Sequence, residues 1–85
     1  MASYSVLIKR AAAKELEELE LRDRRRVVQR IRALAGDPRP PGCEKLSGND
    51  KYRIRQGDLR VLYEVDDQLT TVTVVKIGHR RDVYR

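Results

Sequence analysis

One segment, residues 51–60, constrains the fold most, because it reads as a β-hairpin. Its sequence Lys-Tyr-Arg-Ile-Arg-Gln-Gly-Asp-Leu-Arg alternates, which places a tyrosine and an isoleucine on one face and Arg53 and Arg55 on the other. Gly57 and Asp58 are typical of a two-residue turn, since glycine supplies the positive φ that such turns need. This turn predicts three cross-strand pairs: Arg55 with Arg60, Ile54 with Val61, and Tyr52 with Tyr63.

The predicted pairing of Arg55 with Arg60 points to a bound anion. Like charges directly opposite each other destabilise a sheet, so stability alone does not favour two facing arginines. A guanidinium group matches a phosphate in a bidentate way, and Arg53 lies on the same face. We therefore expect this face to bind the phosphate backbone of RNA or DNA, whereas the opposite face, with Tyr52 and Tyr63, is expected to belong to the core.

Size and composition place any functional site at the surface. The chain has 85 residues, 38% of them charged and 5% aromatic, which fits one small domain (1–85) with a core of Val, Leu, Ile and Ala. The net charge of +6 favours a polyanionic partner. No apolar run is long enough to span a membrane, so a cytoplasmic protein without a membrane partner is expected. One cysteine, Cys43, and one histidine are too few for a structural zinc site, and no metal site is predicted.

The hydrophobic pattern predicts two helices after a short first strand over residues 4–9. Apolar residues at helical spacing indicate an amphipathic helix over residues 11–21 and, after a pause around Asp23, a second helix. The second helix is defined by Val27, Val28, Ile31, Leu34 and Ala35. Asp23 is a candidate N-cap of the second helix, and Gly36 can take the left-handed position that ends it. Arginines that alternate with the apolar stripe of this helix are read as a solvated face that could assist RNA docking electrostatically; they are Arg22, Arg24, Arg25, Arg26, Arg30 and Arg32.

Two more strands, over residues 59–65 and 70–77, follow the first strand of the hairpin. Their mutual register stays open, because loops of two and three residues would give opposite facings. The predicted order is β-α-α-β-β-β. The expected fold is α+β, with a helical hairpin packed on a small, mainly antiparallel sheet.

Several motifs, taken in order, resemble those of the RelE/ParE superfamily of bacterial toxins. They are Tyr4-x-Val-x-Ile, Ala-x-Lys-Glu-Leu at 12–16, Lys45-Leu-x-Gly, Tyr52-Arg-Ile-Arg-x-Gly-Asp-x-Arg-Val-x-Tyr63, and Ile77-Gly-His-Arg-x-x-Val-Tyr84. The resemblance covers nearly the whole chain. Its most specific part is the hairpin followed by the terminal motif, and that ending is more similar to the RelE branch.

The RelE resemblance implies a toxin of a type II toxin–antitoxin system. Members of this branch are ribosome-dependent endonucleases that cut mRNA within codons in the ribosomal A site and inhibit translation, without a metal or other cofactor. The implied partners are a cognate antitoxin, the 30S A site and mRNA, with operator DNA bound only through the antitoxin complex. The antitoxin is expected to present an acidic or amphipathic segment that folds as it binds.

The resemblance also carries over site residues, which are Arg53, Arg55, Arg60, Arg80 and Tyr84. Arg60 and Arg80 are expected to clamp the transition state, Arg53 and Arg55 to bind the RNA backbone, and Tyr84 to act as base or to stack on a nucleobase. The family often has lysine in the hairpin. Arginine stays protonated and is a poor base, so His79 is a second candidate for the base, unless it is only a solvated turn residue.

Further basic residues could contact RNA phosphates, or could be ordinary surface charges; they are Lys45, Lys51, Lys76 and Arg81. Two other functions also fit the same fold. One is a ParE-like protein that inhibits DNA gyrase without catalysis, and the other is a degenerate member that binds its antitoxin but is not toxic.

Overall fold

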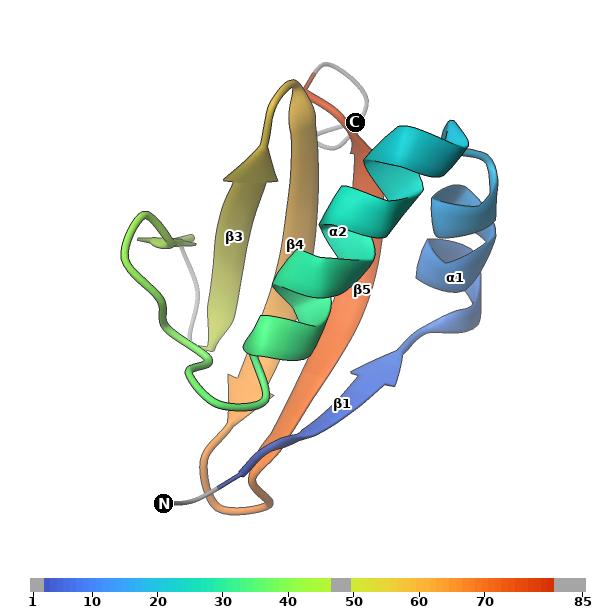
Figure 1. Ribbon diagram of the computed structural model, residues 1–85. Coiled ribbons are helices and arrows are strands. Elements are labelled where there is room, and N and C mark those ends of the chain that lie inside the picture. Colours follow the sequence, from blue (N-terminus) through green and yellow to red (C-terminus); the bar gives the residue numbers. More distant parts are fainter. Residues whose placement is uncertain (1–2, 47–49, 81–85) are drawn as a thin grey trace.

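The computed structural model describes residues 3–46 and 50–80, and two helices cover one face of a five-stranded sheet (Figure 1). The elements are β1 (Ser5–Ile8), α1 (Arg10–Glu17), α2 (Leu21–Ala33), β2 (Glu44–Lys45), β3 (Lys51–Gln56), β4 (Leu59–Asp66) and β5 (Thr71–His79). The predicted α+β fold is confirmed, and the structure adds the short strand β2. In the described part of the chain, neither helix has the length and apolar character that crossing a bilayer would require.

The strands lie in the order β1-β5-β4-β3-β2. β1 pairs with β5 in parallel, with Ser5 opposite Thr71, and the other neighbours are antiparallel. The first and the last strand of the described chain therefore lie side by side (Figure 1). The sequence pattern shows that both strands exist but contains no local signal for their pairing, because helices separate them along the chain.

The hairpin between β3 and β4 forms as predicted. Arg55 lies opposite Arg60, Ile54 opposite Val61, and Tyr52 opposite Tyr63. Gly57 has a φ of 61°, the left-handed conformation that the turn requires. All three predicted cross-strand pairs are confirmed.

A bulge settles the register between β4 and β5. The pairing shifts between Leu62 and Tyr63, so that Leu62 lies opposite Lys76 but Tyr63 lies opposite Val74. The extra residue in β5 reverses its alternation, and a bulge of this kind increases local twist. As a result Val74 and Ile77 are both buried although they are an odd number of positions apart.

The predicted boundaries of the second helix are wrong at both ends. α2 begins at Leu21 with Glu20 at the N-cap, so Asp23 lies in the first turn, where a negative charge favours the helix N-terminus. The arginine-rich segment continues the helix because arginine is a good helix former even where it contributes nothing to the core. At the other end Leu34 closes the helix in a right-handed conformation. Within residues 3–46 and 50–80, the glycines with positive φ are Gly42 and Gly57, and Gly36 is not among them.

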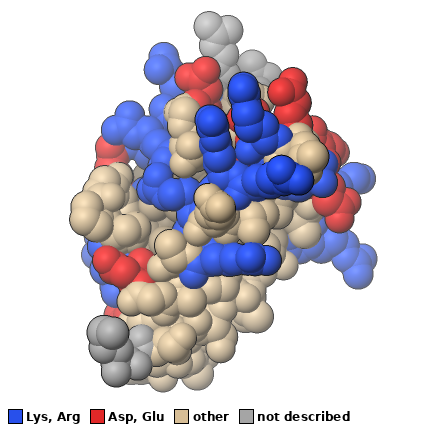
Figure 2. All heavy atoms as spheres, viewed as in Figure 1, with Lys and Arg blue, Asp and Glu red and all other residues tan. Residues whose placement is uncertain are grey.

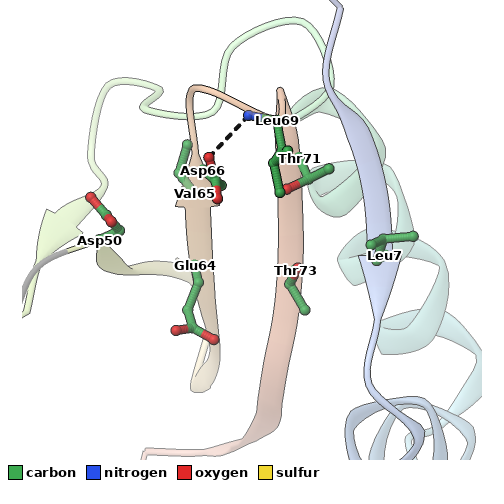
Figure 3. A pocket seen from close by; sticks show the side chains of 8 residues that line it. All are labelled: Leu7, Asp50, Glu64, Val65, Asp66, Leu69, Thr71 and Thr73. Atoms are coloured by element: carbon green, nitrogen blue, oxygen red, sulfur yellow. Dashed lines mark hydrogen bonds between the residues drawn. The ribbon is translucent and has the colours of Figure 1, made fainter.

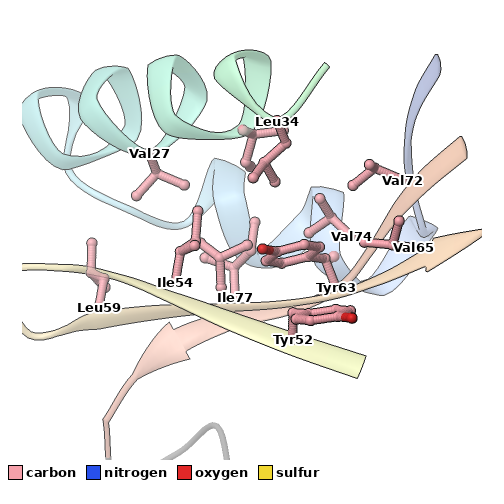
Figure 4. Packing of buried hydrophobic residues seen from close by; sticks show 13 residues of the cluster. Val27, Leu34, Tyr52, Ile54, Leu59, Tyr63, Val65, Val72, Val74 and Ile77 are labelled. Atoms are coloured by element: carbon pink, nitrogen blue, oxygen red, sulfur yellow. The ribbon is translucent and has the colours of Figure 1, made fainter. Parts of the chain in front are cut away.

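The core lies between the helices and the sheet (Figure 4). Val27, Ile31 and Leu34 of the α2 segment face the apolar side chains of β3, β4 and β5. Tyr52 and Tyr63 stack with their ring centroids 5.8 Å apart, which confirms that both belong to the core. The Tyr63 hydroxyl donates a hydrogen bond of 2.8 Å to the carbonyl of Pro38, and burial raises the Tyr63 pKa well above its ordinary value.

A polar network closes the end of the sheet at which β1 begins. Arg39 forms a bidentate ion pair with Asp67, with N–O distances of 3.1 and 2.8 Å. Tyr4 donates a hydrogen bond of 2.7 Å to the same carboxylate. The Arg39 guanidinium also lies 5.1 Å from the centre of the Tyr52 ring and donates to its hydroxyl. Asp67 thereby joins the N-terminal segment, the loop after α2 and the β4–β5 turn.

Replacing Asp67 by asparagine is expected to destabilise the protein near neutral pH and to matter less in acid. Hydrogen bonds from Arg39 and Tyr4 hold the Asp67 pKa below its ordinary value. The ion pair therefore contributes stability above the unfolded pKa of about 3.9, and that contribution is lost as the pH falls through the lower folded pKa. Urea unfolding of both proteins from about pH 7 to about pH 2.5 should show a constant difference in free energy of unfolding that closes only below about pH 4. A difference that stays constant throughout would contradict this assignment.

Candidate functional site

The arginine face, defined as the side of the sheet that carries Arg53, Arg55 and Arg60, forms away from the helices. Arg53 and Arg55 alternate along β3 with the buried residues Tyr52 and Ile54, and Arg60 follows the buried Leu59 on β4. Because neighbouring positions of a strand point to opposite sides, the packing of the core fixes which side the arginines occupy. The predicted gathering of the three arginines is confirmed.

A carboxylate that the sequence analysis missed lies between two of these arginines. Glu44 is opposite Arg53 in the register of β2 and β3, and its two carboxylate oxygens pair separately with Arg53 and Arg55. The contact to Arg55 Nη2 measures 3.2 Å. The expectation that only an external anion could balance the facing arginines was therefore incomplete. Recognising Glu44 requires knowing that β2 pairs with β3, and a two-residue strand leaves no periodic signal in the sequence.

Arg60 differs from the other two arginines because it is nearly buried. Its exposed fraction is 6%, and its Nη1 donates to the carbonyls of Gly57 and Leu59 at 3.1 Å each. Arg55, which lies opposite, is instead paired with Glu44. The like charges of Arg55 and Arg60 can lie opposite each other because each guanidinium has its own hydrogen-bond acceptors.

The final motif lies beside the hairpin turn. The backbone N–H of Arg80 donates a hydrogen bond of 3.0 Å to the carbonyl of Asp58, and His79 lies opposite Leu59 in the sheet. Both side chains are exposed. The structure thus brings Arg80 and His79 close to the turn that Arg60 holds, while the predicted site residues Tyr84 and Arg81 lie outside the described residues.

The three lysines predicted to contact RNA occupy different surroundings. Lys51 lies opposite Glu64, and Lys45 follows Glu44 on β2, so alternation turns Lys45 to the other side of the strand. Lys76 lies 3.8 Å from a carboxylate oxygen of Glu15 on α1, and the other oxygen of that carboxylate accepts a hydrogen bond from the backbone of Ile77. Lys76 therefore has a structural partner, and its contact with Glu15 helps to hold α1 against β5.

The same side of the sheet carries the opposite charge at its far end. A groove of about 380 Å³ lies there, lined by Leu7, Asp50, Glu64, Val65, Asp66, Leu69, Thr71 and Thr73 (Figure 3). Glu64 and Asp66 follow Arg60 on β4 at alternate positions. The three carboxylates of the groove repel a phosphate backbone. A nucleic acid on this side of the sheet would therefore be confined to the arginine end.

Basic side chains also gather on the opposite side of the molecule, over α2 (Figure 2). Two of the predicted arginines have structural contacts there: Arg24 Nη2 donates to the carbonyls of Glu17 and Leu19, both at 3.2 Å, and Arg30 donates to the carbonyl of Arg55 at 3.1 Å. Arg22, Arg25, Arg26 and Arg32 are exposed, as expected for a solvated helix face. The bond from Arg30 fixes the backbone of β3 where it carries Arg55.

The chain is similar to known toxins over nearly its whole length. Residues 6–84 match the family described as ParE toxin of type II toxin-antitoxin system, parDE. Toxin RelG of Mycobacterium tuberculosis is 33% identical in an alignment 86 residues long that covers 96% of this chain and 97% of that protein.

Solved structures show the same fold. A chain of the archaeal RelE–RelB complex from Pyrococcus horikoshii has a TM-score of 0.85 and 30% identity, covering 94% of this chain and 98% of its own. A chain of the RelBE2 toxin–antitoxin complex from Mycobacterium tuberculosis has a TM-score of 0.80 and 28% identity, covering 92% of this chain and 99% of its own. Both matching chains come from structures of complexes, one described as RelE–RelB and the other as toxin–antitoxin.

Proposed function

The chain belongs to the ParE toxin family of type II toxin–antitoxin systems, within the RelE/ParE superfamily, and from this premise we propose that it is a ribosome-dependent mRNA endonuclease. The proposal rests above all on one observation: the backbone bond from Arg80 to Asp58 brings the Gly-His-Arg motif to the turn beside Arg60. The relatives named RelG and RelE support the nuclease branch. The substrate is mRNA in the ribosomal A site, cut within codons.

The proposed chemistry assigns the arginines to phosphate. The 2′-oxygen of the RNA forms a bond to the adjacent phosphorus and loses its proton, while the bond to the 5′-oxygen breaks and that oxygen gains a proton. The phosphorane between these steps carries extra negative charge, which Arg60 and Arg80 stabilise. Arg60 uses Nη1 for the turn carbonyls, and its remaining N–H groups serve the phosphate.

The other roles are distributed around this centre. Arg53 and Arg55 bind the RNA backbone, with Arg81 as an outer contact. Lys45, Lys51 and Lys76 take no part in this proposal, because Lys45 is turned to the other side of β2, Lys51 lies opposite Glu64 and Lys76 is paired with Glu15. His79, exposed at the end of β5, and Tyr84 are the candidates for the base, and Tyr84 alternatively stacks on a nucleobase. The mechanism calls for no metal or other cofactor, because the arginines supply the positive charge that phosphate displacement needs.

A purified translation system tests the nuclease function. Primer extension is carried out on an mRNA under translation, with and without the protein, and on the same mRNA without ribosomes. New ends within codons should occur only when both ribosomes and protein are present. Intact mRNA under translation would contradict the proposal.

The match to the ParE family favours a second candidate, inhibition of DNA gyrase without catalysis. A supercoiling assay distinguishes the two, because a gyrase inhibitor blocks supercoiling and leaves translating mRNA intact. A protein inactive in both assays that still binds an antitoxin would be a degenerate member of the family.

The proposed partner is a cognate antitoxin, as in the complexes that share this fold. The arginine face attracts an acidic segment by charge, and a segment that covers it blocks RNA at the same time. The protein is proposed to act in the cytoplasm, on the 30S A site, and to contact operator DNA only through the antitoxin. Co-purification with the small protein from the adjacent reading frame tests this partnership.

A further inference from the structure

We propose that Glu44 is a built-in competitor for the RNA phosphate: its carboxylate occupies the anion position of the arginine face, and RNA binds Arg53 and Arg55 by displacing it. This inference rests on the proposed function, because it names the event by which RNA enters that site. It concerns binding and assigns no catalytic role to Glu44.

The geometry places the carboxylate where a phosphate would bind. One oxygen of Glu44 pairs with Arg53, and the other lies 3.2 Å from Arg55 Nη2. Two adjacent oxygens that bridge two guanidinium groups are the arrangement in which a phosphodiester would bind the same pair. The Glu44 carboxylate and a backbone phosphate therefore compete for one site.

The burial of the three side chains shows that the contact between Glu44 and Arg55 is open to water. The Arg53 side chain is 17% exposed, whereas those of Glu44 and Arg55 are 49% and 54% exposed. Half-exposed ion pairs contribute little to stability, so breaking the contact between Glu44 and Arg55 costs little. Glu44 lies on a two-residue strand at the edge of the sheet, where its flexible side chain can turn to water. The backbone that carries the two arginines is held more firmly than that of Glu44, because β3 pairs with β4 inside the sheet and Arg30 donates a hydrogen bond to the carbonyl of Arg55.

Displacement of a carboxylate has a measurable signature in salt. When a protein neutralises an RNA phosphate, the cations condensed on the RNA are released. The logarithm of the binding constant therefore falls with the logarithm of the salt concentration, with a slope of about 0.7 per phosphate contact for single strands. When the phosphate replaces Glu44, the freed carboxylate attracts cations from solution, which offsets part of the release from the RNA. The wild-type protein should therefore show a shallower salt dependence than its number of arginine contacts would give.

Fluorescence anisotropy with a labelled single-stranded 2′-O-methyl RNA tests this, because that probe lacks the hydroxyl needed for cleavage. Glu44→Gln removes the competing charge and is expected to bind roughly fivefold more tightly at low salt, with a slope steeper by up to about 0.7. Glu64→Gln is the matched control, since it removes the same charge on the same side of the sheet, in the groove away from the arginines. It should change affinity by less than about twofold and leave the slope unchanged. Glu44→Ala, which also removes hydrogen bonding, should behave as Glu44→Gln does, and circular dichroism checks that each variant is folded.

The possible outcomes separate this inference from the proposed function. If Arg55→Ala weakens binding while Glu44→Gln and Glu64→Gln are indistinguishable, RNA binds at the arginine face but Glu44 does not compete, and the inference is overturned. If Arg55→Ala binds as the wild type does, or the probe does not bind at all, RNA does not bind at Arg53 and Arg55 by displacing Glu44, and the inference is overturned. The nuclease function is decided separately, by primer extension on translating mRNA, because that activity requires the ribosome.

Discussion

Replacing Arg80 by alanine is expected to slow the cleavage of translating mRNA by about 30- to 1,000-fold, equivalent to ~2–4 kcal/mol of transition-state stabilisation. The reason is the extra negative charge of the phosphorane, which Arg80 is proposed to stabilise. The turn is held by the backbone N–H of Arg80, and alanine keeps that bond to Asp58. The expected loss is therefore one of activity with an unchanged fold, measured by primer extension alongside thermal unfolding.

Arg22→Ala is the matched control for this change. Arg22 is exposed on α2, so its replacement removes the same charge from the other side of the molecule. It should cut at close to the native rate. Arg60→Ala is expected to lose as much activity as Arg80→Ala, but it is a less clean test, because the Arg60 side chain is nearly buried and bonded to the turn. Native-rate cleavage by the Arg80→Ala and Arg60→Ala variants would show that the proposed clamp is wrong.

Truncating Leu34 to alanine should lower the free energy of unfolding by about 2–5 kcal/mol, the usual range for a buried leucine. Leu34 has no exposed surface and closes α2 against the sheet, where it faces the apolar layer of β4 and β5 (Figure 4). Its removal leaves a cavity between helix and sheet and loses the transfer free energy of the deleted atoms. Urea unfolding followed by circular dichroism measures the change.

Leu21→Ala provides the same chemical change without the burial. Leu21 begins α2 and is 55% exposed, so its truncation should change the free energy of unfolding by less than about 0.5 kcal/mol. Equal losses for the two variants would mean that α2 is not packed on the sheet through Leu34. A small helix-covered sheet depends on few such contacts, because a chain of this size has a limited core.

The arginine hairpin could be predicted from the sequence because every signal for it is local. Alternation along residues 51–60 fixes which side chains share a face, and Gly57 fixes the turn and therefore the register. The stack of Tyr52 on Tyr63 follows from the same two facts. The terminal motif could be expected near this site from the resemblance to a known superfamily.

Other features could not be predicted because they depend on contacts between distant segments. The bulge between Leu62 and Tyr63 has no turn residue to mark it, yet it decides that Ile77 rather than Lys76 faces the core. Glu44 reads as an ordinary loop carboxylate until β2 is placed beside β3. The start of α2 was misplaced because exposed arginines extend a helix without extending its apolar stripe.

The parallel pairing of β1 with β5 has a consequence for the synthesis of this protein. β5 lies between β1 and β4, so the earliest strand to emerge from a ribosome has no partner until residues 71–74 have also emerged. A chain that terminates before Thr71 lacks the strand that joins the two parts of the sheet, and its hydrophobic face stays uncovered. Arg80 follows that strand directly, so the clamp is assembled only after the sheet can close. Incomplete translation products are therefore expected to be unfolded and harmless to the ribosomes that make them.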